Sequence, residues 1–314
     1  MFKVMTWNVE NLFRPGAPAG LPSQAVFEQK LDGLAAVIES QSPDALAVQE
    51  IGDPDALDDL IARLTGTWHQ RVSSHPDRRG IRVAWLTRAP ISAPEDITDF
   101  PPPLGPVQSD DQGGSEAATG RGVLAVTVKH GGSDVRLVTA HLKSKLLTFP
   151  GGVFQPTDED ERARFGAYAL YRRTAEAATV RVAVSAMLGN AGDTRALVVT
   201  GDLNDTPEAA TTQLLLGPPG SEIGTPGFAQ PDHGDRQRLW NLAPLMPPGK
   251  DHSRVNHGRP ELIDHILVSA ALVHKSPSAE AVIEQPLPSV TNDPTARHGA
   301  PSSDHAPVVA TFDV

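Results

Sequence analysis

The sequence predicts an α/β protein, because short apolar runs of the β type alternate along the chain with amphipathic stretches of helical periodicity. At 314 residues with 39% hydrophobic side chains, the chain is long enough to bury a large core. A third observation is that six of the apolar runs end in a carboxylate, a carboxamide or an imidazole. We therefore expect the chemistry of the protein where its strands end.

The first two strand-like runs supply acidic side chains. Residues 3–7 alternate polar and apolar side chains and place Asn8 and Glu10 at or just past a strand end, on one side because side chains repeat with period two. Residues 45–48 form a second apolar run that leads to Glu50. Glu50 is a plausible hard oxygen ligand for Mg²⁺ or Mn²⁺, which take one or two carboxylates and leave other positions to water and phosphate.

Two central runs end in a histidine and in an acidic motif. Residues 135–140 lead to His141, and Lys143 and Lys145 follow closely. These lysines are placed to meet phosphate oxygens, although solvated lysines would explain the same pattern. Residues 196–200 lead to Asp202 and Asn204, which lie two positions apart and can share a face.

Two late motifs combine aspartate with histidine. Asp264 begins a strand-like run, and Asp304 and His305 precede the last apolar run of the chain. An Asp and a His on neighbouring strands can form a dyad in which the carboxylate fixes the tautomer of the ring and raises its basicity. Asp264 and His305 are the candidates for this dyad, whereas His265 should alternate away from the site as a structural neighbour.

Helices are expected between the strands. Ser23 is a predicted N-cap of a helix over residues 24–41, in which apolar side chains recur at three- and four-residue steps. Residues 158–188 predict one long helix or a helix pair, and residues 206–208 predict a cap with Pro207 in the first turn of another helix. Segments rich in Pro and Gly predict loops at residues 100–122, 150–157, 217–235 and 275–303. Loop 100–122 is either a lid or a disordered insertion.

Charge and composition limit the function. The net charge is −11 and the pI is near 5.4, which argues against a tight nucleic-acid binder more than against a hydrolase. The absence of cysteine excludes disulfides and thiol chemistry. No apolar run approaches the roughly 18 residues of a membrane span, and the N-terminus enters a strand without a signal pattern, so we expect a cytoplasmic protein without a membrane partner.

Each polar residue also has a structural explanation. Asp and Asn directly after strands are common turn and cap residues, and for any one of them alone that explanation is the simpler one. Trp7 is flanked by apolar strand residues and is more simply a core residue than a base-stacking platform. The coincidence of six such motifs reverses this preference.

Taken together, the strings WNVEN, QE, AHLKSK, GDLND, IDH and SDHAPV, in this order, resemble the endonuclease/exonuclease/phosphatase superfamily, which includes DNase I-like and exonuclease III-like enzymes. The resemblance extends from residue 6 to residue 312, and the strings around His141 and Asp264 are most similar to a bacterial, nuclease-like branch. It implies a four-layer αββα sandwich, with two mixed β-sheets flanked by helices. Because the motifs interleave from end to end, we expect a single domain over residues 1–314.

The resemblance also implies roles for the matching residues. Those that would hold or orient the metal are Glu50, the main ligand, with Asn8 and Asp304. Those that would act on water or phosphate are Asp202, Asn204, His141 and the Asp264–His305 dyad. Glu10 takes the place of an acidic residue that supports the site in some relatives. One departure concerns His141, since some relatives pair this histidine with a glutamate, and Arg82 stands near that place here.

The sequence thus predicts a phosphodiesterase dependent on Mg²⁺ or Mn²⁺ that cleaves by direct attack of an activated water, without a covalent intermediate. DNA or RNA is the expected substrate, and the sequence indicates no obligate protein partner. A phosphatase or phosphodiesterase acting on a small or lipid-linked ester is the alternative, although the WCDR-type string of inositol-phosphate relatives is absent. A non-catalytic binding module is a third hypothesis, which retention of the acidic and histidine motifs disfavours.

Overall fold

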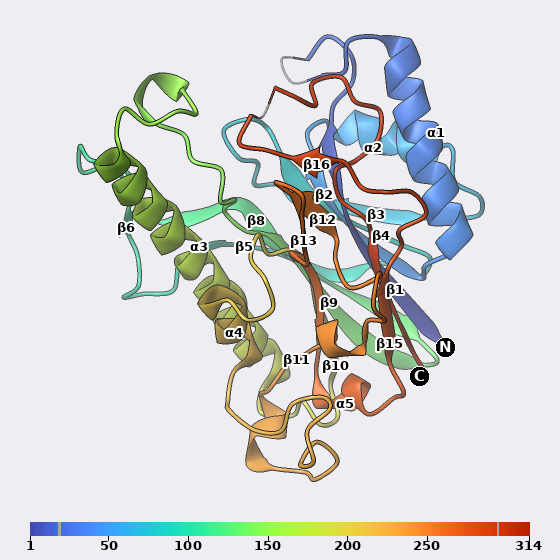
Figure 1. Cartoon of the computed structure of the whole chain (residues 1–314). Coiled ribbons are helices and arrows are strands. Elements are labelled where there is room, and N and C mark those ends of the chain that lie inside the picture. Colours follow the sequence, from blue (N-terminus) through green and yellow to red (C-terminus); the bar gives the residue numbers. More distant parts are fainter. Residues whose placement is uncertain (18–19, 294) are drawn as a thin grey trace.

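Two six-stranded sheets pack face to face in the computed structural model, which describes residues 1–17, 20–293 and 295–314 (Figure 1). The first sheet has the order β15 (Ser278–Ala281), β17 (Val308–Phe312), β1 (Phe2–Leu12), β2 (Ala45–Ile51), β4 (Arg82–Thr87) and β3 (His69–Val72). The second has the order β11 (Trp240–Asn241), β14 (Asp264–Val268), β10 (Ala196–Asp202), β9 (Ser133–His141), β8 (Ala118–His130) and β5 (Ser92–Asp99). Both sheets are mixed, because β1–β2 and β9–β10 are parallel and their other neighbours are antiparallel.

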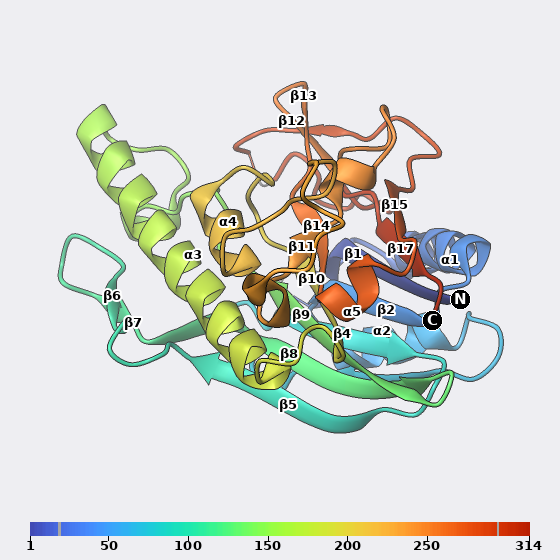
Figure 2. The same ribbon diagram turned by 90° about the horizontal axis from the view of Figure 1, so that it is seen from below.

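Helices cover the outer faces of both sheets. The α-helices are α1 (Gln24–Gln41), α2 (Pro54–Ile61), α3 (Glu159–Leu188), α4 (Ala210–Leu216) and the short α5 (Ala270–Val273). Figure 2 shows α1 and α2 on the side of the first sheet and α3 and α4 on the side of the second. The 3₁₀ turns are η1 (Pro150–Gly152), η2 (His233–Arg236) and η3 (Ala243–Leu245). The predicted four-layer αββα sandwich is thereby confirmed.

Three apolar layers hold this sandwich together. Between the sheets, Val4 and Trp85 of the first sheet belong to one buried cluster with Leu137 and Val198 of the second. A second cluster joins the first sheet to α1 and α2, and a third joins the second sheet to α3 and α4. Trp7 lies in the second cluster and is 5% exposed, as its apolar flanks predict.

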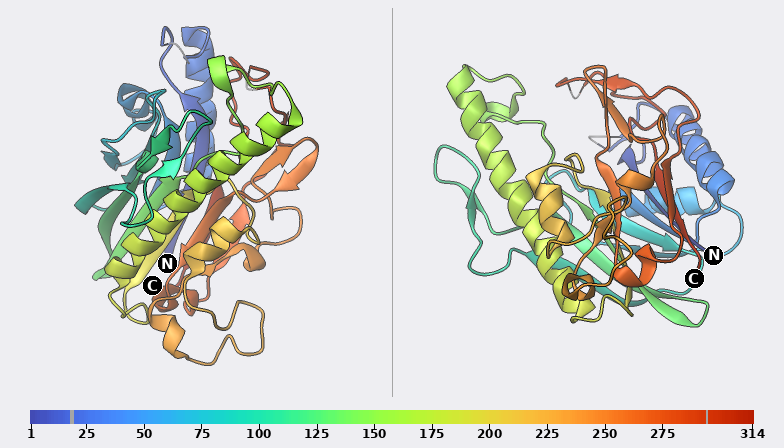
Figure 3. Two further views of the ribbon diagram at one scale, coloured as in Figure 1. Left: turned by 90° about the vertical axis from the view of Figure 1, so that its left-hand side faces the viewer. Right: turned by 60° about the horizontal axis from the view of Figure 1, so that its bottom comes forward.

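The helix predictions are confirmed for α1 and refined elsewhere. Ser23 caps α1 at the predicted position, where its Oγ accepts a hydrogen bond from the Val26 amide at 3.3 Å. Residues 159–188 form one helix capped by Asp158, not a helix pair. Figure 3 shows α3 running diagonally over the second sheet. The predicted cap at residues 206–208 is wrong: α4 begins at Ala210, because Thr206 O accepts from Ala209 N and closes a separate turn first.

Two predicted loops contain short strands. Residues 275–303 include β15, an edge strand of the first sheet, and β16 (Ser289–Val290), which joins β12 (Arg254–Asn256) and β13 (Arg259–Glu261) in a small sheet. Residues 100–122 include the two-stranded β6 (Val107–Gln108) and β7 (Ser115–Glu116). This segment is fastened to α3, because Asp111 accepts from Tyr168 at 2.9 Å and pairs with Arg164 at 3.0 Å.

None of the described helices combines the length and the apolar composition that a bilayer crossing requires.

Candidate active site

Strand pairing brings the predicted site residues together from five strands. The strand end predicted at Asn8 and Glu10 is wrong, because β1 continues to Leu12. The parallel pairing of β9 with β10 sets His141 opposite Asp202, and the antiparallel pairing of β10 with β14 sets Asp202 opposite Asp264. The first sheet adds Asn8 from β1 and Glu50 from β2. A hydrogen bond of 2.9 Å from Asn8 Nδ2 to Asp202 Oδ2 links the two sheets at this point.

Asp202 is the centre of this cluster. Its Oδ2 also lies 3.3 Å from Nε2 of His141, and its Oδ1 accepts from the Asn204 amide at 2.9 Å. Asn204 is held in turn by a 3.0 Å hydrogen bond from its Nδ2 to Leu142 O. Burial, reinforced by the negative charge of Asp264, raises the pKa of Asp202 to about 7. Asp202 can therefore exchange a proton near neutral pH.

Asp264 and His305 form the dyad that their motifs predict. Asp264 Oδ2 lies 2.6 Å from His305 Nδ1, and both side chains are buried. Burial disfavours a charged ring, but the carboxylates of Asp264 and Asp304 outweigh it and raise the pKa of His305 to about 10. Trp7 Nε1 donates to His305 O at 2.9 Å and fixes the backbone beneath the ring. His305 is thus an imidazolium at neutral pH, with Nε2 left for another partner.

The pKa of His141 is shifted in the opposite direction to that of His305. Burial, together with the positive charge of Arg121, lowers the pKa of His141 well below its usual value, so the ring is neutral. Its Nδ1 is buried and has no hydrogen-bond partner within the described chain. Arg82 does not fill this position, because its guanidinium donates to Gly80 O at 2.7 Å. The observed partner of His141 is Asp202.

Glu50 lies at the open side of the cluster. Its Oε2 accepts from the Asn11 amide at 2.9 Å, and its Oε1 is 3.4 Å from Asn8 Nδ2. Asn8 is fully engaged, since its Oδ1 also accepts from the Glu10 amide at 3.0 Å. In this arrangement Asn8 orients Glu50 and Asp202 through its amide hydrogens.

Glu10 is bound by an arginine that the sequence did not suggest. Arg297 donates to Glu10 Oε1 at 2.9 Å and to Oε2 at 2.8 Å. The amide of Asp304 adds a 3.0 Å hydrogen bond to the same Oε2. Glu10 therefore fastens the C-terminal motif to β1, which fits a supporting position.

The backbone around the cluster is strained. Four residues without glycine's freedom have positive φ: Glu10 (50°), Asn11 (54°), Glu50 (66°) and Asn204 (54°). Such conformations cost roughly 1–3 kcal/mol each and gather at functional sites. Gly201, at φ 138°, is required for close approach, because a Cβ there would lie 1.9 Å from Ala140 O.

The two predicted lysines are already engaged. Lys143 Nζ donates to Ser144 O at 3.0 Å and to Leu146 O at 2.9 Å, and burial, with the nearby charge of Arg121, lowers its pKa to about 8. Lys145 pairs with Asp205 at 3.0 Å. Asp304 lies more openly, with its carboxylate 3.9 Å from His305 Nε2 and 3.7 Å from Arg254 Nε.

Several cations and one structural histidine complete the surroundings. Arg121, Arg254 and Arg297 are partly buried near the cluster. Their proximity depends on the folding of distant segments, so no local pattern marks them. His265 is buried and its Nε2 lies 2.8 Å from Asp205 O, as expected for a structural residue.

The donor set fits a hard divalent ion. Glu50 presents a carboxylate at the open side, and Asp264 Oδ1 is buried without a hydrogen-bond partner among the described residues. Ligand atoms of Asp202, Asp264 and His305 also lie within 4.8 Å of one another. We do not assign this triad as a complete ligand set, because the raised pKa of His305 keeps its Nε2 protonated, and a protonated nitrogen does not bind a metal. Carboxylate oxygens are the donors that Mg²⁺ and Mn²⁺ prefer.

Comparisons with known proteins identify the family and the fold. The sequence model of the Endonuclease/Exonuclease/phosphatase family matches residues 5–305. No curated protein matches the chain. A solved structure of truncated TDP2 from Caenorhabditis elegans is 17% identical, with a TM-score of 0.57 over 99% of this chain and 96% of that chain.

Two bacterial structures are similar to the same extent. A mannosyl-6-phosphatase of Bacteroides thetaiotaomicron is 14% identical, with a TM-score of 0.58 over 99% of both chains. An endonuclease/exonuclease/phosphatase family protein of Leptotrichia buccalis is 15% identical, with a TM-score of 0.56 over the full length of both chains. These likenesses show a shared fold. Because the family model spans nearly the whole sequence, the chain belongs to the Endonuclease/Exonuclease/phosphatase family.

Proposed function

We propose that the protein is a divalent-metal-dependent phosphodiesterase that cleaves DNA or RNA by in-line attack of an activated water. One observation carries this proposal: both sheets contribute to one cluster in which Asp202 and the Asp264–His305 dyad are buried and Glu50 lies at the open side. This inventory combines a hard-ion ligand, a proton acceptor and a fixed cation. Phosphoryl transfer needs these groups, because its catalysis consists mainly of positioning and charge stabilisation.

Glu50 is the residue that we propose as the main metal ligand, with Mg²⁺ or Mn²⁺ as the ion and Asp304 as a further candidate. When bound, such an ion supplies charge neutralisation at the phosphate and stabilisation of the leaving oxygen. Asn8 keeps the Glu50 carboxylate in place through its 3.4 Å contact. Glu10 is excluded from direct ligation in this arrangement, because Arg297 and the Asp304 amide occupy its oxygens.

The other side chains of the cluster act on the attacking water and on the phosphate. Asp202, with its pKa raised by burial to about 7, orients the attacking water and accepts its proton. Such a base contributes roughly 10²- to 10⁴-fold. The His305 imidazolium donates from Nε2 to a non-bridging phosphate oxygen while Asp264 holds its other nitrogen. Asn204 and His141 fix the Asp202 carboxylate, and the neutral His141 adds a polar contact for the phosphate.

Support for a nucleic-acid substrate comes from relatives and from local charge. Danio rerio TDP2 was solved in complex with a single-strand DNA product. In this chain Arg121 and Arg254 flank the cluster despite a net charge of −11. A substrate strand that visits briefly needs local cations at the reacting phosphate more than a basic surface.

A small phosphate ester is the second candidate substrate. The similar mannosyl-6-phosphatase acts on a sugar phosphate according to its name, and an acidic surface suits a small substrate better than a long polyanion. The same catalytic cluster would serve either reaction, because both transfer a phosphoryl group to water.

A panel of substrates tests the proposal. Metal-free protein is incubated with Mg²⁺, Mn²⁺ or a chelator, and each condition is tested on four separate substrates. These are supercoiled plasmid, end-labelled single-stranded oligonucleotide, an aryl phosphodiester and an aryl phosphomonoester. We expect metal-dependent nicking of plasmid or shortening of the oligonucleotide, lost in Glu50→Gln and His305→Ala. Cleavage of the monoester alone would favour the second candidate. Full hydrolysis by Glu50→Gln would overturn the site assignment.

A further inference from the structure

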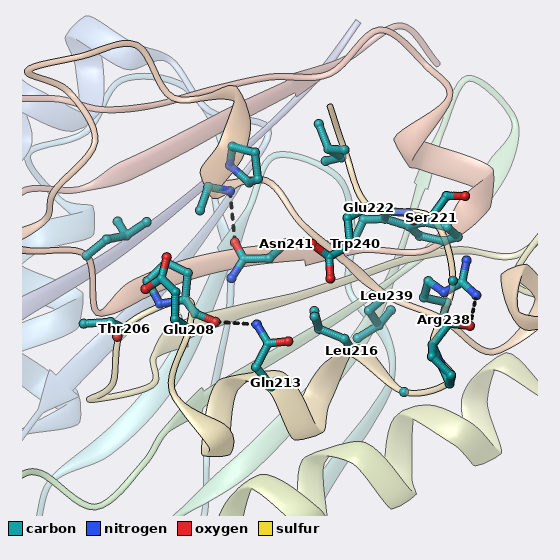
Figure 4. Close-up of a pocket in the computed structure, with 18 of the residues that line it drawn as sticks. Thr206, Glu208, Gln213, Leu216, Ser221, Glu222, Arg238, Leu239, Trp240 and Asn241 are labelled. Carbon is teal, nitrogen blue, oxygen red and sulfur yellow. Dashed lines mark hydrogen bonds between the residues drawn. The ribbon is translucent and has the colours of Figure 1, made fainter. Parts of the chain in front are cut away.

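A pocket of about 710 Å³ lies beside the candidate active site, against β11 and α4 (Figure 4). Thr206 and Leu262, which line it, are each two residues from a cluster member, Asn204 and Asp264 respectively. The cluster side chains themselves do not line the pocket in the described structure. Its volume is in the range of small-molecule sites, roughly 300–1,000 Å³.

Hydrogen bonds hold one wall of the pocket in a preformed shape. Trp240 Nε1 donates to Ser221 O at 3.0 Å, and Arg238 Nε donates to Pro218 O at 2.9 Å. The guanidinium of Arg238 also packs closely against Gly220, where a Cβ would lie 1.6 Å from a guanidinium nitrogen. Segment 217–223 is therefore pinned to β11 and the preceding turn, and it needs little ordering when a ligand binds.

The lining has an excess of negative charge. Its acidic side chains are Glu208, Glu222, Asp251 and Glu261. Among the described residues, Arg238 is the only Lys or Arg that lines the pocket, and its charge is neutralised by ion pairs with Asp232 at 3.1 Å and Asp235 at 3.0 Å. Glu208, Glu222 and Glu261 have no ion-pair partner in the part of the chain that the structure describes, and Asp251 lies 3.6 Å from His252. The pocket thus repels phosphate-bearing ligands.

Beneath this acidic rim the surface is mainly apolar. Leu216 is half-buried and contributes to it, whereas Leu239 and Leu262 border it with small exposed fractions. Trp240 is only 4% exposed, and the Arg238 guanidinium already lies over its ring, 5.3 Å from the ring centroid. Apolar groups of a ligand can pack on this surface, and a cation gains from the carboxylates at its edge. We propose that this pocket binds a small amphipathic monocation, with an ammonium group at the carboxylate rim and a hydrocarbon or aromatic body on the apolar surface.

Three probes that share one ring but differ in charge test this inference: tryptamine (cation), indole (neutral) and indole-3-acetate (anion). Calorimetric titration of the intact protein should show tryptamine binding more tightly than indole, with indole-3-acetate weakest. In Glu208→Gln/Glu261→Gln the affinity for tryptamine should fall about 2- to 30-fold, as expected for two partly exposed charge pairs. Affinity for indole should stay unchanged.

A matched control removes an exposed carboxylate elsewhere. Glu28 lies on α1, outside the pocket, and the Glu28→Gln variant should bind tryptamine with the same affinity as the wild type. Equal affinity for all three probes, no binding of tryptamine, or an unchanged affinity in the double variant would each overturn the proposal. Because the variants leave the catalytic cluster intact, this test is independent of the proposed hydrolysis.

Discussion

Replacement of Asp264 by asparagine should convert His305 from a permanent cation into a group that titrates below neutral pH. Asp264 Oδ2 lies 2.6 Å from His305 Nδ1, and both side chains are buried. The substitution preserves the shape of the side chain but removes the negative charge that opposes desolvation of the ring. The variant therefore isolates the electrostatic part of the dyad.

The magnitude follows from the pKa of His305. A rise from 6.5 to about 10 corresponds to a preference for the imidazolium on the order of 5 kcal/mol, at about 1.4 kcal/mol per pK unit. Because the folded pKa is raised, this stabilisation is fully present below pH 6.5 and is lost as the pH rises through about 10. Asp264→Asn should accordingly lower the free energy of unfolding most at about pH 6.5, progressively less as the pH rises, and least above pH 10.

Nitrogen chemical shifts of the histidine rings, followed by NMR against pH, measure this directly. The wild-type His305 ring should remain doubly protonated through pH 8, whereas the ring in Asp264→Asn should be neutral at pH 7. Urea unfolding at pH 7 and pH 10 supplies the matching free energies. A wild-type pKa of His305 near 6.5, or the same pKa in the variant, would refute the reasoning.

Three further substitutions test other parts of the site. Burial raises the pKa of Asp202 from 3.8 to about 7, so the contribution of this side chain to stability is present below pH 3.8 and is lost as the pH rises through 7. Asp202→Asn removes the buried charge and should therefore stabilise the metal-free protein at pH 8, by on the order of 4 kcal/mol at most, as measured by urea unfolding. Arg297→Gln removes the guanidinium that donates to both oxygens of Glu10 and should lower the free energy of unfolding by roughly 1–3 kcal/mol in the same measurement. Arg297→Lys keeps the positive charge and should lower it by less. Gly201→Ala drives a methyl group against Ala140 O and should lower the melting temperature by several degrees or prevent folding.

The sequence signals that indicate the candidate site residues are local. His141, Asp202 and Asp264 lie at strand ends, and strand ends can be recognised from period-two alternation and the polar residue that follows. The layers could be inferred from the same runs together with the family resemblance. The Ser23 cap shows how far such local signals reach, since its side-chain oxygen and the apolar spacing after it define the start of α1.

What the sequence could not show depends on contacts between distant segments. Arg297 meets Glu10 across 287 positions, and no local pattern joins them. β15 lies in a segment rich in Pro and becomes a strand through pairing with β17. Within the described part of the chain, Nδ1 of His141 has no hydrogen-bond partner, which is likewise a tertiary property.

The central claim is that Asp202 activates water for metal-dependent phosphodiester cleavage. The most direct measurement compares the rates of plasmid nicking by the wild type and by Asp202→Asn, with Mn²⁺, between pH 5.5 and 9. The account predicts that wild-type nicking rises with pH as Asp202 loses its proton, and that the folded variant is at least about 100-fold slower at pH 8. Comparable rates for the two proteins, or nicking that persists in chelator, would contradict it.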